Sequence, residues 1–168
     1  MINNNIYQYY VEGDDEKRLL EVLKGDLGYI ASGKVEKFNV VQNELKITRI
    51  RPLKRDTIVV LVYDTDVEKT DILQKNVDFL KSQAGIKDVI CVPQVKNLEE
   101  ELLYSCRIKN ICELTNSKSN KDFKSDFIRC TNLGSRLTKC SFDLAKFWSR
   151  VPDNKFSVFG NDAKKIKI

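Results

Sequence analysis

One short stretch, residues 58–68 (IVVLVYDTDVE), constrains the fold of this 168-residue chain more than any other. Its first six residues are apolar or aromatic and rich in Val and Ile, which is typical of a buried strand in a parallel sheet. Asp64 and Asp66 follow directly, where such a strand leaves the core. Ligand sites of open α/β sheets lie just beyond the carboxyl ends of their strands. The stretch therefore predicts both an α/β fold and the place of its functional site.

The spacing of the two aspartates indicates a cation. Alternate side chains of an extended chain point the same way, so Asp64 and Asp66 are expected on one side of the backbone. Two close carboxylates repel each other unless a proton or a cation joins them. Because Mg²⁺ prefers oxygen ligands, the pair predicts a site for Mg²⁺ or for the similar Mn²⁺.

Strand and helix patterns alternate through the first 95 residues. Strands are predicted at residues 6–11, 35–41, 58–63 and 88–92, the last of them ended by Pro93. Helices are predicted at residues 14–28, which begin with acidic residues and end near two glycines, and at residues 69–83. This alternation specifies a mostly parallel sheet flanked by helices.

Residues 43–56 fit either a short helix or a strand, because Pro52 ends both. The segment carries five basic side chains, which are Lys46, Arg49, Arg51, Lys54 and Arg55. Two interpretations stay open from the sequence, a solvent-facing connector or a contact with substrate.

The character of the sequence changes after residue 96. Short helices are predicted at residues 97–114, 121–130, 135–140 and 142–150, and residues 116–120 form a polar linker. Residues 101–168 hold 14 Lys and Arg against 7 Asp and Glu, whereas residues 1–100 hold 15 against 17. We therefore expect a core at residues 1–96 and a basic, helical extension at residues 97–168 that packs on it.

The basic excess of the extension suits a nucleic-acid surface, although a solvated helical face explains it equally well. The candidate nucleic-acid contacts are Lys118, Lys121, Lys124, Arg129, Arg136 and Lys139. Phe147 and Trp148 are expected in the core rather than stacked on bases.

Composition excludes several function classes. The chain has no histidine, so triads that use a histidine base are excluded and catalysis must use carboxylates, lysines, tyrosines or metal. Its five cysteines are irregularly spaced without a C-x-x-C pair, which argues against a zinc site and favours reduced thiols. No apolar run approaches the roughly 18 residues of a membrane span, and the N-terminal residues lack a secretory pattern. A cytoplasmic location is therefore expected.

Three features in order, Glu12-Gly13 after the first strand, Asp64-x-Asp66 after a later one, and the alternation between them, resemble the TOPRIM domain. This family includes topoisomerases, bacterial primases and the OLD-family nucleases. The local sequence VEGDDEKRLLEVL is most similar to the E-G-x-x-E form of the OLD-type and RloB-type phage-defence proteins, which adds Glu16. The resemblance covers residues 6–95.

The resemblance implies a metal-dependent nuclease that cleaves DNA or RNA in anti-phage defence. Its implied metal ligands are Glu12, Glu16, Asp64, Asp66 and Glu68, and its implied catalytic residues are Glu12, Asp64, Asp66 and Lys96. Such nucleases commonly work beside an ATPase, and this sequence contains no phosphate-binding G-x-x-x-x-G-K-[ST] loop. A separate ATPase subunit is therefore an expected partner.

Other classes compete with this interpretation. A response-regulator receiver also places an acidic pair after its first strand, here Asp14 and Asp15, and would be phosphorylated on Asp64. It does not explain Asp66 or Glu12. A haloacid-dehalogenase phosphatase uses D-x-D as well, but usually on its first strand. A TOPRIM-like module that binds nucleic acid without cleaving it is the third alternative.

Overall fold

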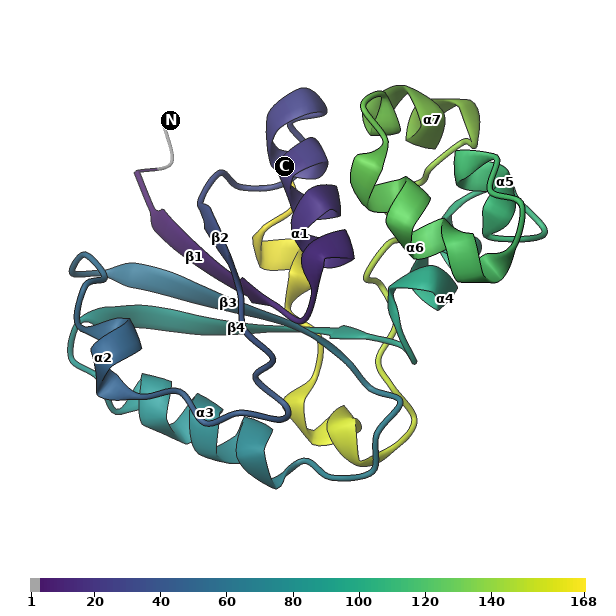
Figure 1. Cartoon of the computed structure of the whole chain (residues 1–168). Helices are drawn as coiled ribbons and strands as arrows, with labels where there is room; N and C mark the ends of the chain where they lie inside the picture. The colour runs from purple at the N-terminus through teal and green to yellow at the C-terminus, as the bar shows by residue number, and fades with distance from the viewer. Residues whose placement is uncertain (1–3) are drawn as a thin grey trace.

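The computed structural model describes residues 4–168, and its centre is a four-stranded sheet in which all strands run parallel (Figure 1). The strands are β1 (Ile6–Val11), β2 (Lys34–Lys37), β3 (Thr57–Asp64) and β4 (Ile86–Gln94), in the order β2-β1-β3-β4. Helices cover both faces, so the expected α/β class with a parallel sheet is confirmed.

One face of the sheet packs against α1 (Asp14–Glu21), the π-helical turn Val22–Asp26 that continues it, and the helices of the C-terminal half. Those helices are α4 (Leu98–Ser105), α5 (Cys112–Thr115), α6 (Asn120–Arg129) and α7 (Leu133–Lys139). Tyr9 and Val60 of the sheet share one buried cluster with Leu19, Phe127 and Trp148. Residues on both sides of position 96 thus contribute to a single core.

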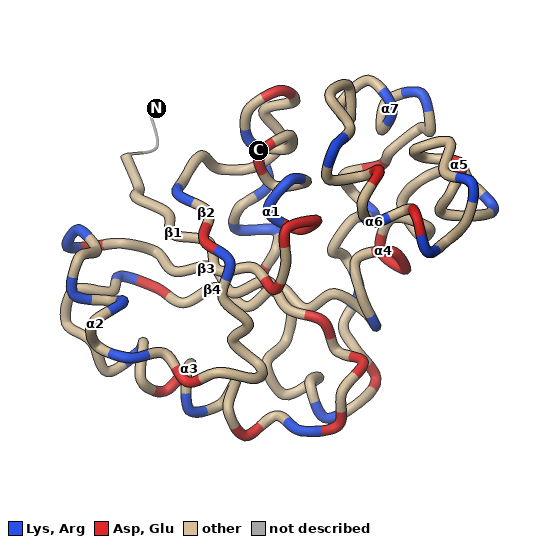
Figure 2. The backbone as a smooth tube through the Cα atoms, in the orientation of Figure 1, with Lys and Arg blue, Asp and Glu red and all other residues tan. Residues whose placement is uncertain are grey.

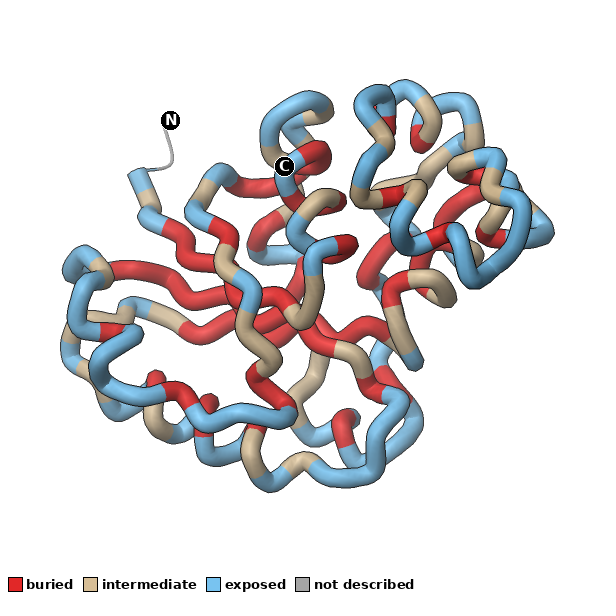
Figure 3. The backbone as a smooth tube through the Cα atoms, viewed as in Figure 1, coloured by how far each residue is buried: buried red, intermediate tan, exposed pale blue. Residues whose placement is uncertain are grey.

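The opposite face carries α2 (Ile47–Ile50) and α3 (Asp71–Lys81). Tyr10, Leu61 and Cys91 of the sheet pack there against Leu73 of α3 and against Phe156. Phe156 belongs to the 3₁₀-helix Lys155–Phe159, so the end of the chain returns to cover this face as well (Figure 1). Figure 3 shows the central strands buried between the two layers.

The predicted end of β4 at Pro93 is wrong, because the strand continues to Gln94. Pro93 lies opposite Tyr63 of β3, and β4 is an edge of the sheet. Proline cannot donate a hydrogen bond, but an edge strand has one side that needs no donor. The extra residues place a polar side chain, Gln94, beside the end of β3.

The second strand is shorter than predicted. β2 ends at Lys37, because the Asn39 side chain accepts hydrogen bonds from the backbone N–H groups of Val41 and Gln42, at 3.0 and 3.1 Å. This local bond turns the chain before residue 41. The ambiguous residues 43–56 contain the single helical turn α2.

Two predicted helices of the C-terminal part are not continuous. The helix expected at residues 97–114 is divided into α4 and α5, with Cys106 extended at the end of α4. Residues 142–150 form turns, because Asp143 N–H donates to Ser105 O and Trp148 has a left-handed backbone with φ of 52°. In residues 142–150, hydrogen bonds to backbone groups elsewhere in the fold thus replace those of a continuous helix.

None of the helices within residues 4–168 has the length and apolar content needed to cross a membrane.

Candidate functional site

The carboxyl ends of β1, β3 and β4 bring three polar side chains together. Glu12 follows β1, Asp64 ends β3 and Gln94 ends β4. The backbone N–H of Asp64 donates to Glu12 Oε2 at 3.4 Å, and Gln94 Nε2 donates to Asp64 Oδ1 at 2.7 Å. The predicted meeting of Glu12 and Asp64, 52 positions apart in the chain, is therefore observed.

Glu16 joins this group from the first turn of α1. Its Oε2 accepts the backbone N–H of Gly13 at 3.0 Å, and its Oε1 lies 3.4 Å from Gln94 Nε2. A Cβ on Gly13 would come within 2.8 Å of Asp15 Oδ1 and 3.1 Å of Glu16 Oε2. The glycine of the Glu-Gly pair is thus needed for the carboxylates to approach the start of the helix.

The carboxyl groups of this cluster are hard to ionise. Burial and then the charge of Glu12 raise the pKa of Asp64 to about 8, although the hydrogen bond from Gln94 acts to lower it. Burial also raises the pKa of Glu12. The pKa of Glu16 is raised by burial and then by its neighbours Asp15 and Asp64. Acids held this close without a counterion favour protonation.

Lys124 of α6 is the cation that reaches the cluster. Its Nζ lies 3.4 Å from Oδ1 of Asp15, which is buried, and 3.7 Å from where a Cβ on Gly13 would be. Among the described residues, the other five basic candidates of the extension make no ion pair with these carboxylates. Lys118, Lys121, Arg129 and Lys139 are exposed, and Arg136 donates to Asn132.

Asp66 and Glu68 lie in the acidic loop between β3 and α3, which follows Asp64 in Figure 2. Both side chains are exposed. The charge of Asp66 reaches Glu12 and Asp64 and contributes to their raised pKa values. Glu68 lines a separate cleft of 830 Å³ beside Asp66, with no contact to Glu12.

Lys96 is held beside the D-x-D motif through its backbone. Its N–H donates to Thr65 Oγ1 at 3.1 Å, and its carbonyl accepts the N–H of Thr65 at 2.9 Å. The residue has a left-handed backbone with φ of 65°, and its side chain is exposed. Its ammonium makes no hydrogen bond or ion pair within residues 4–168.

Gln94 is the site residue that sequence reasoning missed. It is fully buried, and its Oε1 accepts Trp148 Nε1–H at 3.3 Å while its amide group donates to Asp64 and Glu16. The sequence signal for Gln94 is its place as a polar residue directly after the apolar run DVICVP. Because the sequence predicted that the strand ends at Pro93, Gln94 was not included among the candidate site residues.

The donor set suits Mg²⁺ or Mn²⁺ by chemistry, because every candidate ligand is a carboxylate oxygen. Within residues 4–168, however, no three or more acidic, cysteine or histidine side chains form a group arranged to hold a metal. Hydrogen bonds from Gln94 occupy oxygens of both Asp64 and Glu16. Glu12 and Asp64 are the partly exposed pair that a cation could reach from solvent.

Comparisons with protein-family models, with curated proteins and with solved structures each find no match for this chain. The TOPRIM resemblance therefore stays a prediction from the sequence motifs.

Proposed function

We propose that this chain is a Mg²⁺-dependent TOPRIM-type nuclease that cleaves phosphodiester bonds of DNA or RNA, in anti-phage defence beside a separate ATPase. The observation that carries the proposal is the 3.4 Å contact between the Asp64 backbone N–H and Glu12 Oε2, which joins the two predicted motifs. The edge where they meet is the place where open α/β sheets bind their ligands.

Glu12 and Asp64, the partly exposed pair, would hold the metal, with Glu16 buried behind them and Asp66 in the exposed loop nearby. Bound there, Mg²⁺ would neutralise charge on the phosphate and lower the pKa of a bound water. Burial raises the pKa of Glu12, which suits a group that takes a proton from attacking water. Lys124 supplies positive charge on the α6 side, where a phosphate would otherwise meet only carboxylates.

The arrangement gives less support to a receiver domain. Such a domain needs the acidic pair Asp14 and Asp15 to face Asp64. Instead, Asp14 is exposed and pairs with Lys37 at 3.2 Å, while Asp15 pairs with Lys124. The groups that flank Asp64 are Glu12 and Gln94.

The test is cleavage of labelled single- and double-stranded DNA and RNA with Mg²⁺ or Mn²⁺ by the wild-type chain and by Asp64→Asn. We expect cleavage to fall roughly 100-fold or more in Asp64→Asn, because a metal oxygen is replaced by an amide. Asp78→Asn is the matched control, because Asp78 is an exposed aspartate of α3 outside both motifs. Absence of cleavage of every substrate, or equal cleavage by Asp64→Asn, would contradict the proposal. Acyl-phosphate formation at Asp64 from a small phosphodonor would support the receiver instead.

A further inference from the structure

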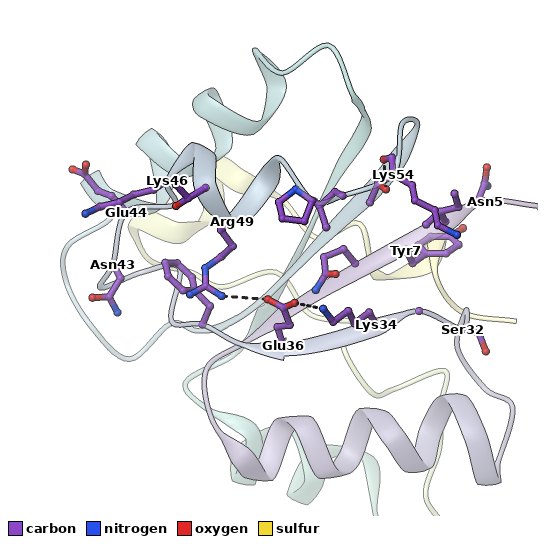
Figure 4. Close-up of a pocket in the computed structure, with 18 residues that line it drawn as sticks. Asn5, Tyr7, Ser32, Lys34, Glu36, Asn43, Glu44, Lys46, Arg49 and Lys54 are labelled. Carbon is purple, nitrogen blue, oxygen red and sulfur yellow. Dashed lines mark hydrogen bonds and ion pairs between the residues drawn. The ribbon is translucent and has the colours of Figure 1, made fainter.

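A second concave site lies on the face of the sheet that carries α2. It is a cleft of 1120 Å³ between β1, β2 and the segment of residues 38–54, and Figure 4 shows its lining. This volume lies slightly above the usual range for small-molecule sites, roughly 300–1,000 Å³. None of the carboxylates of the candidate nuclease site lines it.

Four basic side chains (Lys34, Lys46, Arg49 and Lys54) and two acidic ones (Glu36 and Glu44) line the cleft, which leaves a positive excess. Glu36 lies 2.7 Å from Lys34 and 3.2 Å from Arg49, so one acid is shared by two cations (Figure 4). Lys46 and Lys54 also line the cleft and have no ion pair among the described residues. Figure 4 shows these two lysines on opposite sides of the opening, with Arg49 and Glu36 between them.

Three of the four basic side chains that line the cleft, Lys46, Arg49 and Lys54, belong to one segment of unusual charge. Residues 46–55 carry five Lys and Arg and no acidic residue, and Figure 2 shows this group around α2. A segment with several cations and no acids binds a chain of phosphates more tightly than a single phosphate, because each phosphate contact releases a counterion.

The floor and wall of the cleft offer groups that bases use. Gln8 is 2% exposed, its Nε2 donates to Tyr9 O at 3.2 Å, and its Oε1 accepts no hydrogen bond from residues 4–168. The guanidinium of Arg49 lies 4.5 Å above the ring centre of Phe38. A base edge can donate to the open amide oxygen, and planar arginine and aromatic groups are the surfaces on which single-stranded bases stack.

The cleft leads toward the carboxylates. Phe38 N–H donates to Val11 O at 2.7 Å, and Glu12 is the next residue. Gln8 and Glu12 are four positions apart, which is about 13 Å along a strand. A chain that lies in the cleft can therefore continue to the edge where Glu12 and Asp64 meet.

We propose that this cleft binds a single strand of nucleic acid, with its phosphates at Lys46 and Lys54 and its bases toward Gln8 and the Phe38–Arg49 pair. Naming that strand as the substrate rests on the proposed nuclease function, whereas the binding itself does not. The segment of residues 46–55 is then a substrate contact rather than a connector.

The experiment measures binding without cleavage. Fluorescence anisotropy of labelled oligothymidylate and oligouridylate of about 20 nucleotides is followed in EDTA over a series of salt concentrations. The test variant is Lys46→Gln/Lys54→Gln. The control, Lys81→Gln/Lys164→Gln, makes the same charge change at two exposed lysines outside the cleft. The DNA and RNA probes report which sugar the cleft prefers.

We expect the test variant to bind about 25-fold more weakly at about 0.1 M salt, and the slope of log K against log salt to fall by about 1.4, because two phosphate contacts are lost. The control should match the wild-type chain. Equal affinity and slope in the two double variants, or no binding by the wild-type chain, would overturn the inference.

Cleavage of the same probes in Mg²⁺ is measured in a separate assay. If the wild-type chain cleaves the probes but the test variant binds them as tightly as the wild-type chain does, only the proposal that the cleft binds nucleic acid is overturned. If binding depends on the two lysines but the wild-type chain does not cleave the probes, only the proposed nuclease function is overturned.

Discussion

Two buried glutamates, Glu16 in the first turn of α1 and Glu101 in α4, have opposite surroundings. Glu101 is fully buried and accepts the backbone N–H groups of Val95 at 2.8 Å and Trp148 at 3.2 Å. Arg150 adds a guanidinium nitrogen at 3.4 Å. Burial still raises the pKa of Glu101, but each of these partners acts to lower it. The carboxylate thus ties the loop after β4 to the C-terminal segment.

Glu16 is 4% exposed, and its nearest charged neighbours are also acids. Gly13 N–H and the Gln94 amide donate to it, but Asp15 and Asp64 both raise its pKa further. Repulsion among buried carboxylates destabilises the fold, and strongly shifted pKa values in such a cluster indicate a functional site more often than a structural one. Glu101 is thus surrounded by groups that stabilise its charge, whereas Glu16 is surrounded by groups that oppose it.

The largest expected effect is the loss of the Glu101 interactions. Glu101→Ala leaves two buried N–H groups and Arg150 without their acceptor, so we expect the free energy of unfolding to fall by about 3 kcal/mol. For a chain of this size the Tm would drop by roughly 6–12 °C. Urea and thermal unfolding measure this. Glu100→Ala, on the same helix, should change stability by less than about 0.5 kcal/mol. A similar loss of stability in both variants would contradict the stabilising role assigned to the interactions of Glu101.

The pH dependence of stability probes the carboxylate cluster next. The pKa of Asp64 is raised to about 8 from 3.8, so the folded chain binds more protons than the unfolded chain between these values. Stability contributed by protonated Asp64 is therefore present below about pH 4 and lost as the pH rises toward 8. We expect the free energy of unfolding in EDTA to fall by at least about 2 kcal/mol from pH 5 to pH 7. Asp64→Asn should make this fall smaller without abolishing it, because Glu12 and Glu16 also have raised pKa values. A flat wild-type curve would contradict the pKa shift. Glu36 has the opposite effect, because the hydrogen bond from Lys34 lowers its pKa. Its contribution to stability is lost only at acidic pH, as the pH falls.

Residues whose role depends on neighbours along the strand were predictable from sequence. The buried run at residues 58–63 and the aromatic run at residues 6–11 lie in adjacent parallel strands. Parallel strands end at the same edge, and this is why the contact between Glu12 and Asp64 could be expected before the fold was known. Metal binding and catalysis by these residues stay predictions.

Residues whose role depends on distant partners were not predictable. Gln94 is held in place because Trp148 Nε1–H, 54 positions away, donates a hydrogen bond to its Oε1. Trp148 lies on a turn that the sequence predicted as helical. Glu101 was one of three consecutive glutamates in a first helical turn, with nothing local to separate it from Glu99 and Glu100. Burial and long-range hydrogen bonds distinguish these residues, and neither has a local pattern.

A divalent cation should relieve the repulsion in the cluster. At a Mg²⁺ or Mn²⁺ concentration ten times the Kd, we expect the wild-type chain to gain about 1.4 kcal/mol, or roughly 3–6 °C in Tm. Asp64→Asn should lose this gain, and Asp78→Asn should keep it. Thermal unfolding with and without the cation, at constant ionic strength, measures the difference. An equal gain in all three proteins would place the cation elsewhere on the surface.

The smallest effect separates the two glutamates most directly. Glu16→Gln keeps the shape of the side chain and an oxygen for Gly13 N–H. It removes an acid that folding must protonate at pH 7, because burial and the neighbours Asp15 and Asp64 raise its pKa to about 9. We expect the free energy of unfolding at pH 7 to rise by about 1 kcal/mol, since a neutral polar group needs less compensation when buried. Glu101→Gln, which removes a carboxylate that Arg150 contacts, should lower it. Urea unfolding of the two variants side by side gives the signs. If Glu16→Gln were destabilising as well, Glu16 would be a structural acid like Glu101, and the strain assigned to the carboxylate cluster would have to come from Glu12 and Asp64 alone.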